Sequence, residues 1–324
     1  MAAVQSFFES GKLLKELNHT TITLVPKCQN SSKLKDFRPI SCCNLIYKCI
    51  SGILARRLKA ILPEMIDKAQ STFILGRNIS DNILLVQELL HNYHRKDIKS
   101  RCTIKVDILK AYETVNWRFL LDLLASMGFP LQFIKWVKQC ITSPRFSVNI
   151  NGELVGFFGS SRGPRQGDPL SSCLFVLAME ALSMLINRRV VDSVYGGRPF
   201  EYHWRCRKNK ITHLCFADDL MLFCGNSLPS AKLLQKALFD FSTISRLTPN
   251  SDKSLIFLAG HSATYNSSIM DVFQFPCGYL PVRYLGVPLI TSRLSYSDCK
   301  PLVESITARI RSWSSNFLSF AGRI

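Results

Sequence analysis

Residues 211–225 read ITHLCFADDLMLFCG, and this stretch decides how the rest of the sequence is interpreted. Apolar segments flank the adjacent carboxylates Asp218 and Asp219, which predicts a β-hairpin whose two-residue acidic turn carries both carboxylates at its tip. Asp-Asp is a weaker turn signal than Asn-Gly, so the turn type stays open. Like charges held this close repel and raise each other's pKa unless a cation neutralises them. A divalent metal ion would explain the pair, and a solvated turn is the alternative.

The composition favours a folded, nucleic-acid-binding protein. The chain has 324 residues, enough for a large core and more than one structural unit. Lys and Arg number 41 against 23 Asp and Glu, a formal net charge of +18. Because the basic residues are dispersed along the chain, the excess favours nucleic acid over a membrane as the polyanionic partner. A basic protein with solvated lysines is the alternative interpretation.

The cysteines and the apolar stretches argue against a disulfide-bonded, a zinc-binding or a membrane-spanning protein. Most of the twelve cysteines lie in apolar segments without a C-x-x-C pair, which indicates free thiols in a reducing compartment. A zinc site is not expected, because His91 with His94 and His203 with Cys206 each lack a second ligand pair. The longest apolar stretch, 174–186, is too short to span a bilayer, so we expect no transmembrane segment.

A strand at 103–109 begins a new unit after the mainly helical residues 1–100. The later order of helices, hairpin, helix and strand matches a split βαβ sheet, the α+β arrangement called ferredoxin-like. In that arrangement Asp107, at the exit of the strand, would lie beside the Asp218–Asp219 hairpin. The other expected elements are a strand at 21–26, helices from Asn44 to about 62 (where Pro63 interrupts it), from Ser80 onward, at 117–127 and at 131–141, a hairpin around Asn151-Gly152, helices at 169–187 and 229–246, and strands at 254–259 and 282–290.

Three carboxylates on neighbouring strand ends would form a hard oxygen site of the type that Mg²⁺ accepts. In nucleotidyl transfer, two such ions about 3.5–4 Å apart stabilise the attacking and the leaving oxygens. Each segment alone also fits a structural role, with Asp107 ending a strand and the Asp pair forming a solvated turn. The combination with a further loop favours the metal site.

That loop is RGPRQGDP, residues 162–169, which opens the helix 169–187. Asp168 is expected to cap the helix, and Pro169 suits its first position. Arg162, Arg165 and Gln166 would lie at the helix N-terminus, where free N–H groups and the helix dipole favour an anion such as a phosphate. A capped helix after a glycine-rich turn is also common as a purely structural feature.

Six short blocks extend this pattern over the chain: DFRPIS (36–41), VDILKAY (106–112), RQGDPLS (165–171), FADD (216–219), NSDKS (250–254) and YLGVPL (284–289). Their order and approximate spacing resemble those of reverse transcriptases. The set is most similar to the non-LTR (LINE-type) retrotransposon class, particularly plant elements. Group II intron enzymes are also similar, but DFRPIS together with RQGDPLS favours the LINE type.

The resemblance implies a role for each matched position. Asp107, Asp218 and Asp219 would be catalytic and would bind Mg²⁺ (or Mn²⁺), with Asp219 the more peripheral ligand. Tyr112 would be the gate beneath the incoming sugar, selecting against a ribose 2′-OH. The remaining matched residues would bind the nucleotide and the primer: Gln166 the incoming nucleotide, Arg38 and Lys27 its triphosphate, Lys253 the pyrophosphate, and Tyr284, Leu285 and Gly286 the primer end.

The same resemblance implies a right-hand polymerase fold with helical fingers, a ferredoxin-like palm and a truncated thumb. Residues 1–101 and 129–165 would form the fingers, 102–128 and 166–290 the palm, and 291–324 the start of the thumb. The implied enzyme is an RNA-directed DNA polymerase with an RNA template, a DNA primer and dNTPs as partners, at an intracellular, nuclear location. Its oligomeric state is left open.

Some positions depart from the family pattern, and two other functions remain open. Glu113 stands where the family usually has aspartate, Arg246 replaces a common glycine after a helix, and Pro249 occupies a position that is usually apolar. One alternative is an inactive reverse-transcriptase-like fragment that binds RNA. Another is an intron-maturase-like protein, which should carry a basic helical domain after the palm.

Overall fold

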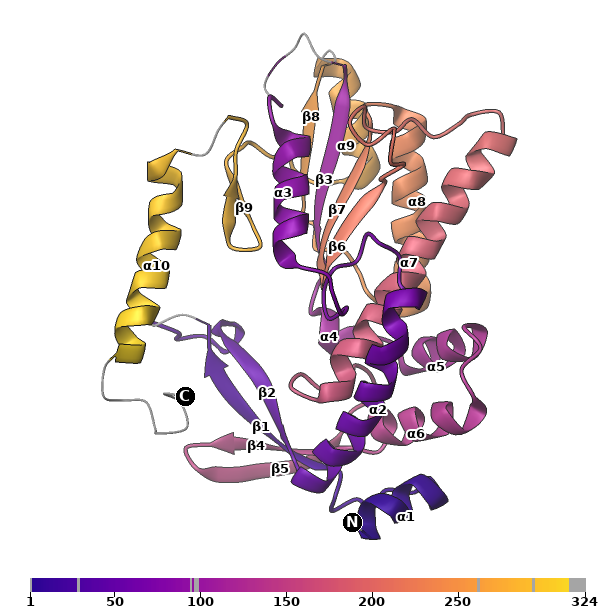
Figure 1. The fold of residues 1–324 in the computed structure, drawn as a ribbon, viewed down its shortest axis with the longest axis vertical. Coiled ribbons are helices and arrows are strands. Elements are labelled where there is room, and N and C mark those ends of the chain that lie inside the picture. Colours follow the sequence, from indigo (N-terminus) through magenta and orange to yellow (C-terminus); the bar gives the residue numbers. More distant parts are fainter. Residues whose placement is uncertain are drawn as a thin grey trace.

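The computed structural model describes residues 2–27, 30–93, 95, 99–260, 263–292 and 295–314. Two four-stranded sheets, in which most neighbouring strands are antiparallel, form its frame, and helices pack around them (Figure 1). The helices are α1 (Ala2–Ser10), α2 (Leu45–Met65), α3 (Ile79–Leu90), α4 (Ala111–Thr114), α5 (Trp117–Ser126), α6 (Leu131–Thr142), α7 (Pro169–Tyr195), α8 (Leu228–Ser245), α9 (Ala263–Phe273) and α10 (Tyr296–Ser314). The strands are β1 (His19–Pro26), β2 (Phe37–Cys43), β3 (Arg101–Asp107), β4 (Arg145–Ile150), β5 (Glu153–Gly159), β6 (His213–Phe216), β7 (Asp219–Gly225), β8 (Leu255–Ala259), β9 (Val282–Tyr284) and β10 (Val287–Leu289).

The central sheet has the order β6-β7-β3-β8, with every neighbouring pair antiparallel. This order confirms the expected ferredoxin-like arrangement. Strand residues alternate between its two faces. Ile104 and Leu222 belong to the core formed with α7 and α8, whereas Met221 and Phe223 belong to a second core with α3 and the β9–β10 hairpin. Both faces of the central sheet are therefore packed against other elements, and the candidate carboxylates lie at its strand ends.

The long apolar segment forms the core helix of the fold. α7 runs from Pro169 to Tyr195, so the expected end at Asn187 was wrong by two turns. Asp168 caps its first turn by accepting a hydrogen bond from the N–H of Leu170 at 3.1 Å, as predicted. Among the described residues α7 alone has the length and composition to cross a membrane, but 78% of its most apolar window is buried inside the fold. Its packing is that of a core helix.

The second sheet has the order β2-β1-β4-β5 and joins segments from distant parts of the sequence. β1 pairs with β2 in an antiparallel manner and with β4 in a parallel manner. Asn151 and Gly152, with φ of 52° and 94°, form the predicted turn between β4 and β5. The preceding helix α2 is capped by Asn44 as expected, but it continues through Pro63 to Met65. The expectation that Pro63 interrupts the helix was therefore wrong, since it lies within the last turn.

Two hairpins differ in detail from the sequence prediction. The turn between β6 and β7 consists of Ala217, with φ of 55°, and Asp218, whereas Asp219 is the first residue of β7. The acidic turn was thus predicted one residue too late, because Ala217 adopts a left-handed conformation that alanine rarely takes. The segment 282–290 is not one strand but two, β9 and β10, which turn at Leu285 and Gly286 with φ of 50° and 86°.

Arg246 provides a test of the helix end. It ends α8 in the left-handed conformation, with φ of 66°. Replacing Arg246 by glycine should raise the free energy of unfolding by about 1 kcal/mol, because glycine adopts this conformation without a steric penalty. Urea unfolding would measure the change. The control Lys232→Gly, in the exposed interior of α8, should lower the stability by about 1 kcal/mol. A variant Arg246→Gly no more stable than the wild type would contradict this account.

Candidate active site

Three carboxylates meet at one end of the central sheet. β3 and β7 pair so that Asp107 lies opposite Asp219, and the β6–β7 turn places Asp218 next to them. Burial is the main cause that raises the pKa of Asp218, and the charge of Asp107 adds to it. Burial also raises the pKa of Asp219, where the charges of Asp218 and Asp107 oppose the lowering effect of Lys105. The structure therefore brings together the three carboxylates that the sequence singled out.

The NSDKS block supports Asp107 from the neighbouring loop. The Asn250 side chain donates to Oδ2 of Asp107 at 3.3 Å, and the Asn250 backbone N–H donates to the Asp107 carbonyl at 2.7 Å. The N–H of Asp107 in turn donates to Oγ of Ser254 at 3.1 Å. Sequence reasoning missed the roles of Asn250 and Ser254, although their block was recognised. Lys253 belongs to the same turn and is exposed.

Tyr112 lies within electrostatic reach of Asp218. Its ring stacks on Phe175 of α7, with the ring centroids 4.6 Å apart. Burial raises the pKa of Tyr112 to about 12, and the charge of Asp218 contributes to the shift. A loop glycine fixes the backbone here, because a Cβ at Gly163 would lie 2.6 Å from the Glu113 carbonyl oxygen. Tyr112 is thus a positioned, half-buried ring beside the carboxylates.

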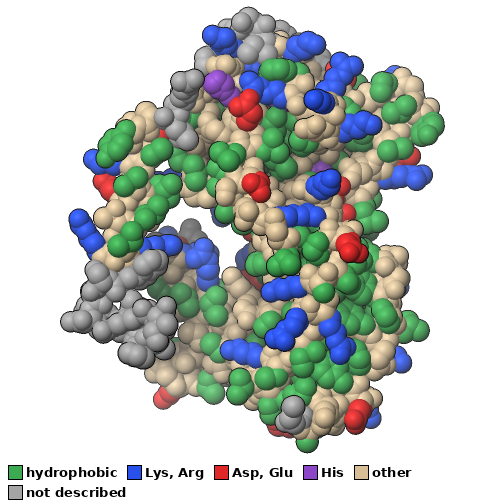
Figure 2. All heavy atoms as spheres, in the orientation of Figure 1, with side chains coloured by type: hydrophobic (Ala, Val, Ile, Leu, Met, Phe, Trp, Pro, Cys, Tyr) green, Lys and Arg blue, Asp and Glu red, His purple; other side chains and the backbone are tan. Residues whose placement is uncertain are grey.

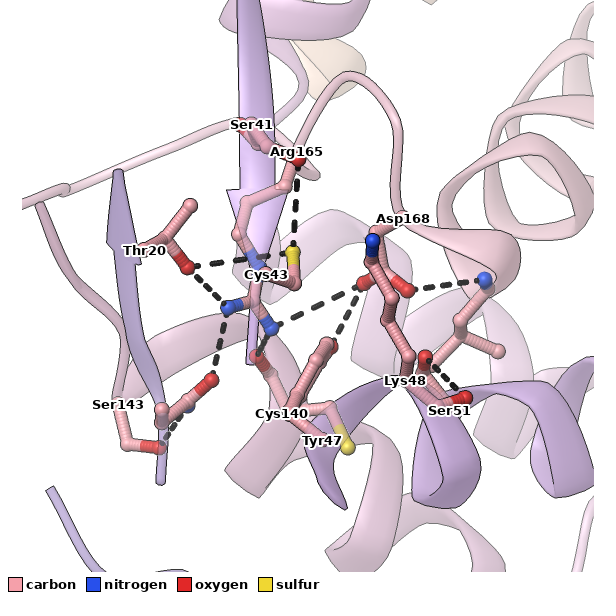
Figure 3. Close-up of polar contacts among 12 residues, drawn as sticks. Thr20, Ser41, Cys43, Tyr47, Lys48, Ser51, Cys140, Ser143, Arg165 and Asp168 are labelled. Atoms are coloured by element: carbon pink, nitrogen blue, oxygen red, sulfur yellow. Dashed lines mark hydrogen bonds and ion pairs between the residues drawn. The ribbon is translucent and has the colours of Figure 1, made fainter. Parts of the chain in front are cut away.

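Arg165 is a structural residue. Its guanidinium donates to the Asn18 side chain at 2.8 Å, to Thr20 at 2.9 Å and to the Cys140 carbonyl at 3.2 Å (Figure 3). It also lies 3.8 Å from a carboxylate oxygen of Asp168. These protein groups surround the guanidinium, and Arg165 is buried. The expectation that Arg165 helps to bind an anion was therefore wrong, because its donors are directed at its own fold.

Tyr47 contacts both members of the buried ion pair between Arg165 and Asp168. The guanidinium carbon of Arg165 lies 3.7 Å from the centroid of the Tyr47 ring, and the Tyr47 hydroxyl donates to Oδ2 of Asp168 at 2.6 Å (Figure 3). Burial and the charge of Asp168 raise the pKa of Tyr47 well above its ordinary value. Arg165, Asp168 and Tyr47 thus tie β1, α2, α6 and the start of α7 together.

The nucleotide-binding candidates lie along β2 and the loop beside it. The Gln166 carbonyl accepts a hydrogen bond from the N–H of Ser41 at 2.9 Å, which joins this loop to β2. Arg38 is exposed on β2 and pairs with Val25 of β1. Lys27 follows β1, is exposed, and its N–H donates to the Asp36 carbonyl at 2.8 Å.

The primer-end candidates form the turn of the β9–β10 hairpin. Tyr284 is 1% exposed, whereas Leu285 is half-buried and Gly286 is exposed at the tip. Burial raises the pKa of Tyr284, with contributions from the charges of Cys215 and Asp219. The hairpin is thus close to Asp219, and its tip, rather than the Tyr284 ring, is accessible from outside.

Comparison with known proteins decides the family. The reverse transcriptase (RNA-dependent DNA polymerase) family matches residues 25–289. The chain belongs to this family. An uncharacterized 149 kDa protein of transposon TX1 from Xenopus laevis is 33% identical over 98% of this chain and 24% of that protein. The Pol polyprotein of the R2DM retrotransposable element of Drosophila melanogaster is 31% identical over 75% of this chain and 22% of that protein. The resemblance to non-LTR elements is confirmed.

Solved structures show the fold of this reverse transcriptase domain. Telomerase from Candida albicans superimposes with a TM-score of 0.57 at 12% identity, over 94% of this chain and 52% of that chain. Apo telomerase from Candida tropicalis gives a TM-score of 0.55 at 13% identity, over 91% and 59% of the two chains. The chain therefore has the right-hand polymerase fold. It spans about a quarter of the length of the retrotransposon relatives, and a plant origin stays a prediction.

Reverse transcriptases generally use divalent metal ions, and the carboxylates suit them by donor type. In the described ranges, however, no group of three or more His, Cys, Asp and Glu side chains is arranged to enclose an ion. Asp107 and Asp219 are paired across β3 and β7, and Asp218 lies in the adjoining turn. Burial and neighbouring carboxylates raise the pKa values of Asp218 and Asp219, and a cation bound beside them would offset both effects. His94, one of the residues with zinc-like spacing, lies outside the described residues.

Proposed function

We propose that the chain is the polymerase part of a non-LTR retrotransposon protein and catalyses RNA-directed DNA synthesis. The juxtaposition of Asp107, Asp218 and Asp219 at one end of the central sheet, in a reverse transcriptase fold, carries the proposal. A primer 3′-OH attacks the α-phosphate of a dNTP, the bond between the α- and β-phosphates breaks, and pyrophosphate leaves. The three carboxylates would bind Mg²⁺ or Mn²⁺, which stabilises charge on the attacking and leaving oxygens in this chemistry.

The remaining site residues position the reactants. Tyr112 would exclude a ribose 2′-OH, and Gln166 would support the incoming nucleotide. The exposed cations Arg38 and Lys27 would bind its triphosphate. Lys253 would donate a proton to the leaving pyrophosphate, since it lies on the loop that supports Asp107. The tip of the β9–β10 hairpin, Leu285 and Gly286, would position the primer end with Tyr284 as its buried support.

RNA is the proposed template. Telomerases from Candida albicans and Candida tropicalis were solved in complex with a fragment of telomeric RNA, and the net charge of +18 suits the same kind of partner. Figure 2 shows a hollow beside the free-standing helix α10, with Lys and Arg side chains along its edges. These cations would attract the phosphate backbone of a primer–template duplex, whatever its base sequence.

The division into polymerase subdomains is also a proposal. The second sheet supports fingers made of 1–101 and 129–165, since it pairs β1 and β2 with β4 and β5. The central sheet, formed by strands from 102–128 and 166–290, supports the palm. For the thumb start, 291–324, the described residues 295–314 contain α10, which stands apart from both sheets (Figure 1).

Primer extension on an RNA template with Mg²⁺ and dNTPs tests the proposal. We expect product with the wild type, no product with Asp218→Ala, and wild-type product with the control Asp122→Ala, whose carboxylate is exposed on α5. Absence of product with the wild type, with salt-sensitive RNA binding retained, would instead support the second candidate function, an inactive module that binds RNA.

Tyr112 offers a test of sugar selection. Tyr112→Ala should reduce the preference for dNTPs over rNTPs by about ten- to two-hundredfold, because the clash with the 2′-OH is removed. The ratio of kcat/KM for a matched dNTP and rNTP measures this preference. Tyr112→Phe keeps the ring and is expected to keep the preference. An unchanged ratio in Tyr112→Ala would exclude Tyr112 as the gate.

A further inference from the structure

A cavity of about 980 Å³ opens beside the first residues of β6. It is lined by the end of α2 and the loop after it, by the middle of α7, and by the segment that leads into β6. The cavity lies away from the carboxylates, because His213 lines it at the start of β6, whereas Phe216 at the other end of that strand pairs with Asp219. Its volume is within the range of sites that bind small organic ligands.

Hydrogen bonds within the protein fix the walls of this cavity. The Arg77 guanidinium donates to the carbonyl of Ile66 at 2.8 Å and to that of Asp67 at 2.5 Å, which holds the loop after α2. The Asp67 carboxylate accepts from the N–H of Ala69 at 2.8 Å and from the Asn187 side chain at 3.0 Å. The charged groups of Arg77 and Asp67 are thus engaged by the protein itself, and the walls are preformed.

Glu180 is the polar group that the floor of the cavity offers to a ligand. It belongs to α7, lines the cavity and is only 6% exposed. Its Oε2 accepts the N–H of Asp67 at 2.9 Å, and burial raises the pKa of Glu180 to about 7. Among the described residues no hydrogen bond reaches Oε1, so this oxygen can accept one from a ligand.

The remaining walls suit a flat, uncharged group. Apolar side chains of Ile66, Leu85 and Ile211 line the cavity. A nucleobase would contact such walls with its faces and Glu180 with its edge, as in sites that hold a base taken out of a stack. Adenine, cytosine and guanine carry an amino group that could donate to Oε1, whereas uracil carries none.

The loop before β6 forms one side of the cavity and is itself fixed. His203 and Cys206 are fully buried, and the N–H of Cys206 donates to the His203 carbonyl at 2.8 Å. Arg205 donates to the Glu88 carbonyl of α3 at 2.6 Å, and the N–H of Ile211 donates to the Cys206 carbonyl at 3.2 Å. The loop therefore presents its exposed side chains from a defined position.

Exposed cations surround the mouth of the cavity. Arg207 and Lys208 are exposed on the loop before β6. Lys210 and Lys68 are exposed as well and line the cavity itself. The exposed acidic residue at the mouth is Glu64, so positive charge predominates there. A basic mouth favours phosphates, whereas the floor favours a base.

We propose that this cavity binds a single strand of nucleic acid outside the polymerase site. One base enters the cavity and donates from its amino group to Glu180. Arg207, Lys208 and Lys210 contact the phosphates on either side of that base. A duplex without unpaired nucleotides is not bound in this way, because its bases are held in the stack. The inference concerns binding alone and does not depend on polymerase activity.

The base contact is tested with labelled strands of ten cytidines or ten uridines. Fluorescence anisotropy at pH 8, where Glu180 is mainly ionised, measures their affinities in the presence of an unlabelled blunt-ended duplex that occupies the polymerase site. The wild type should bind oligo(C) about tenfold more tightly than oligo(U), since only cytosine donates to the carboxylate. Glu180→Gln should abolish or reverse this preference, because glutamine can accept the Asp67 N–H and present an N–H donor to the base.

The phosphate contacts are tested by removing two charges. Arg207→Ser with Lys208→Ser should weaken the binding of both strands by roughly twenty-five-fold at 0.1 M salt, since each phosphate contact contributes about 0.7 to the salt slope. The matched control is Lys135→Ser with Lys138→Ser, which removes two exposed charges from α6 and should leave both affinities unchanged. The same measurement with ten deoxycytidines shows whether the site takes RNA in particular, since only RNA offers a 2′-OH.

Three results would overturn the inference. The first is equal affinity of the wild type for oligo(C) and oligo(U), or an unchanged preference in Glu180→Gln. The second is an equal loss of affinity in the two double variants, which would indicate attraction by net charge alone. The third is complete competition by the blunt-ended duplex. Primer extension is measured separately, so a failure of this inference leaves the proposed polymerase function untouched, and the reverse also holds.

Discussion

Primer extension by Asp218→Asn is expected to be slower than by the wild type by at least about a thousandfold. Loss of one charged oxygen ligand removes several kcal/mol of transition-state stabilisation in metal-assisted phosphoryl transfer, which corresponds to this factor. Asparagine keeps the size of the side chain, so the β6–β7 turn should form as before. Single-turnover extension with preformed primer–template complex would measure the chemical step. Asp219→Asn is the comparison, and we expect a smaller loss because Lys105 already offsets its charge.

The same substitution is expected to stabilise the fold at neutral pH. Burial and the charge of Asp107 raise the pKa of Asp218 in the folded protein. A carboxyl group with a raised pKa favours folding below its ordinary pKa, and this contribution is lost as the pH rises through the folded pKa. At neutral pH the ionised Asp218 therefore destabilises the fold, and asparagine removes this cost. Urea midpoints should be higher for Asp218→Asn than for the wild type at pH 7 and should approach it at acidic pH. A lower midpoint at pH 7 would contradict this account.

The sequence predicted the parts of the site that depend on local pattern. Alternation in β3 and the apolar segments around FADD predicted the two strands, and the ferredoxin-like strand order then predicted Asp107 beside the Asp218–Asp219 hairpin, which the pairing of β3 with β7 confirms. The exact turn was missed, since Ala217 has no side-chain signal for its left-handed conformation. The end of α7 was missed for a related reason. The helix continues past Asn187 to Tyr195, before Gly196. Its last turns are mostly exposed, so the apolar pattern that predicted the helix stops before the helix itself does.

The role of Arg165 could not be predicted, because its partners are distant in sequence. Asn18, Thr20 and Cys140 are separated from it by 147, 145 and 25 residues, and a buried arginine has the same local pattern as a phosphate-binding one. The loop of RQGDPLS therefore combines a backbone that borders β2 with a side chain that fixes the fold. Motif recognition identifies the block, while only the packing shows which of its residues are accessible.

This structural role implies a large loss of stability in Arg165→Met. Methionine has a similar length but leaves Asp168 charged and buried without its partner, and the acceptors Asn18 and Thr20 lose their donor. Breaking a buried pair from one side costs about 3–5 kcal/mol. Urea unfolding should show this decrease, whereas the exposed neighbour Arg162→Met should change stability by less than about 0.5 kcal/mol. The double variant Arg165→Met, Asp168→Asn should recover part of the loss, because the unpaired charge is gone. Equal stabilities of Arg165→Met and Arg162→Met would mean that Arg165 contributes nothing to the fold and is available to a ligand after all.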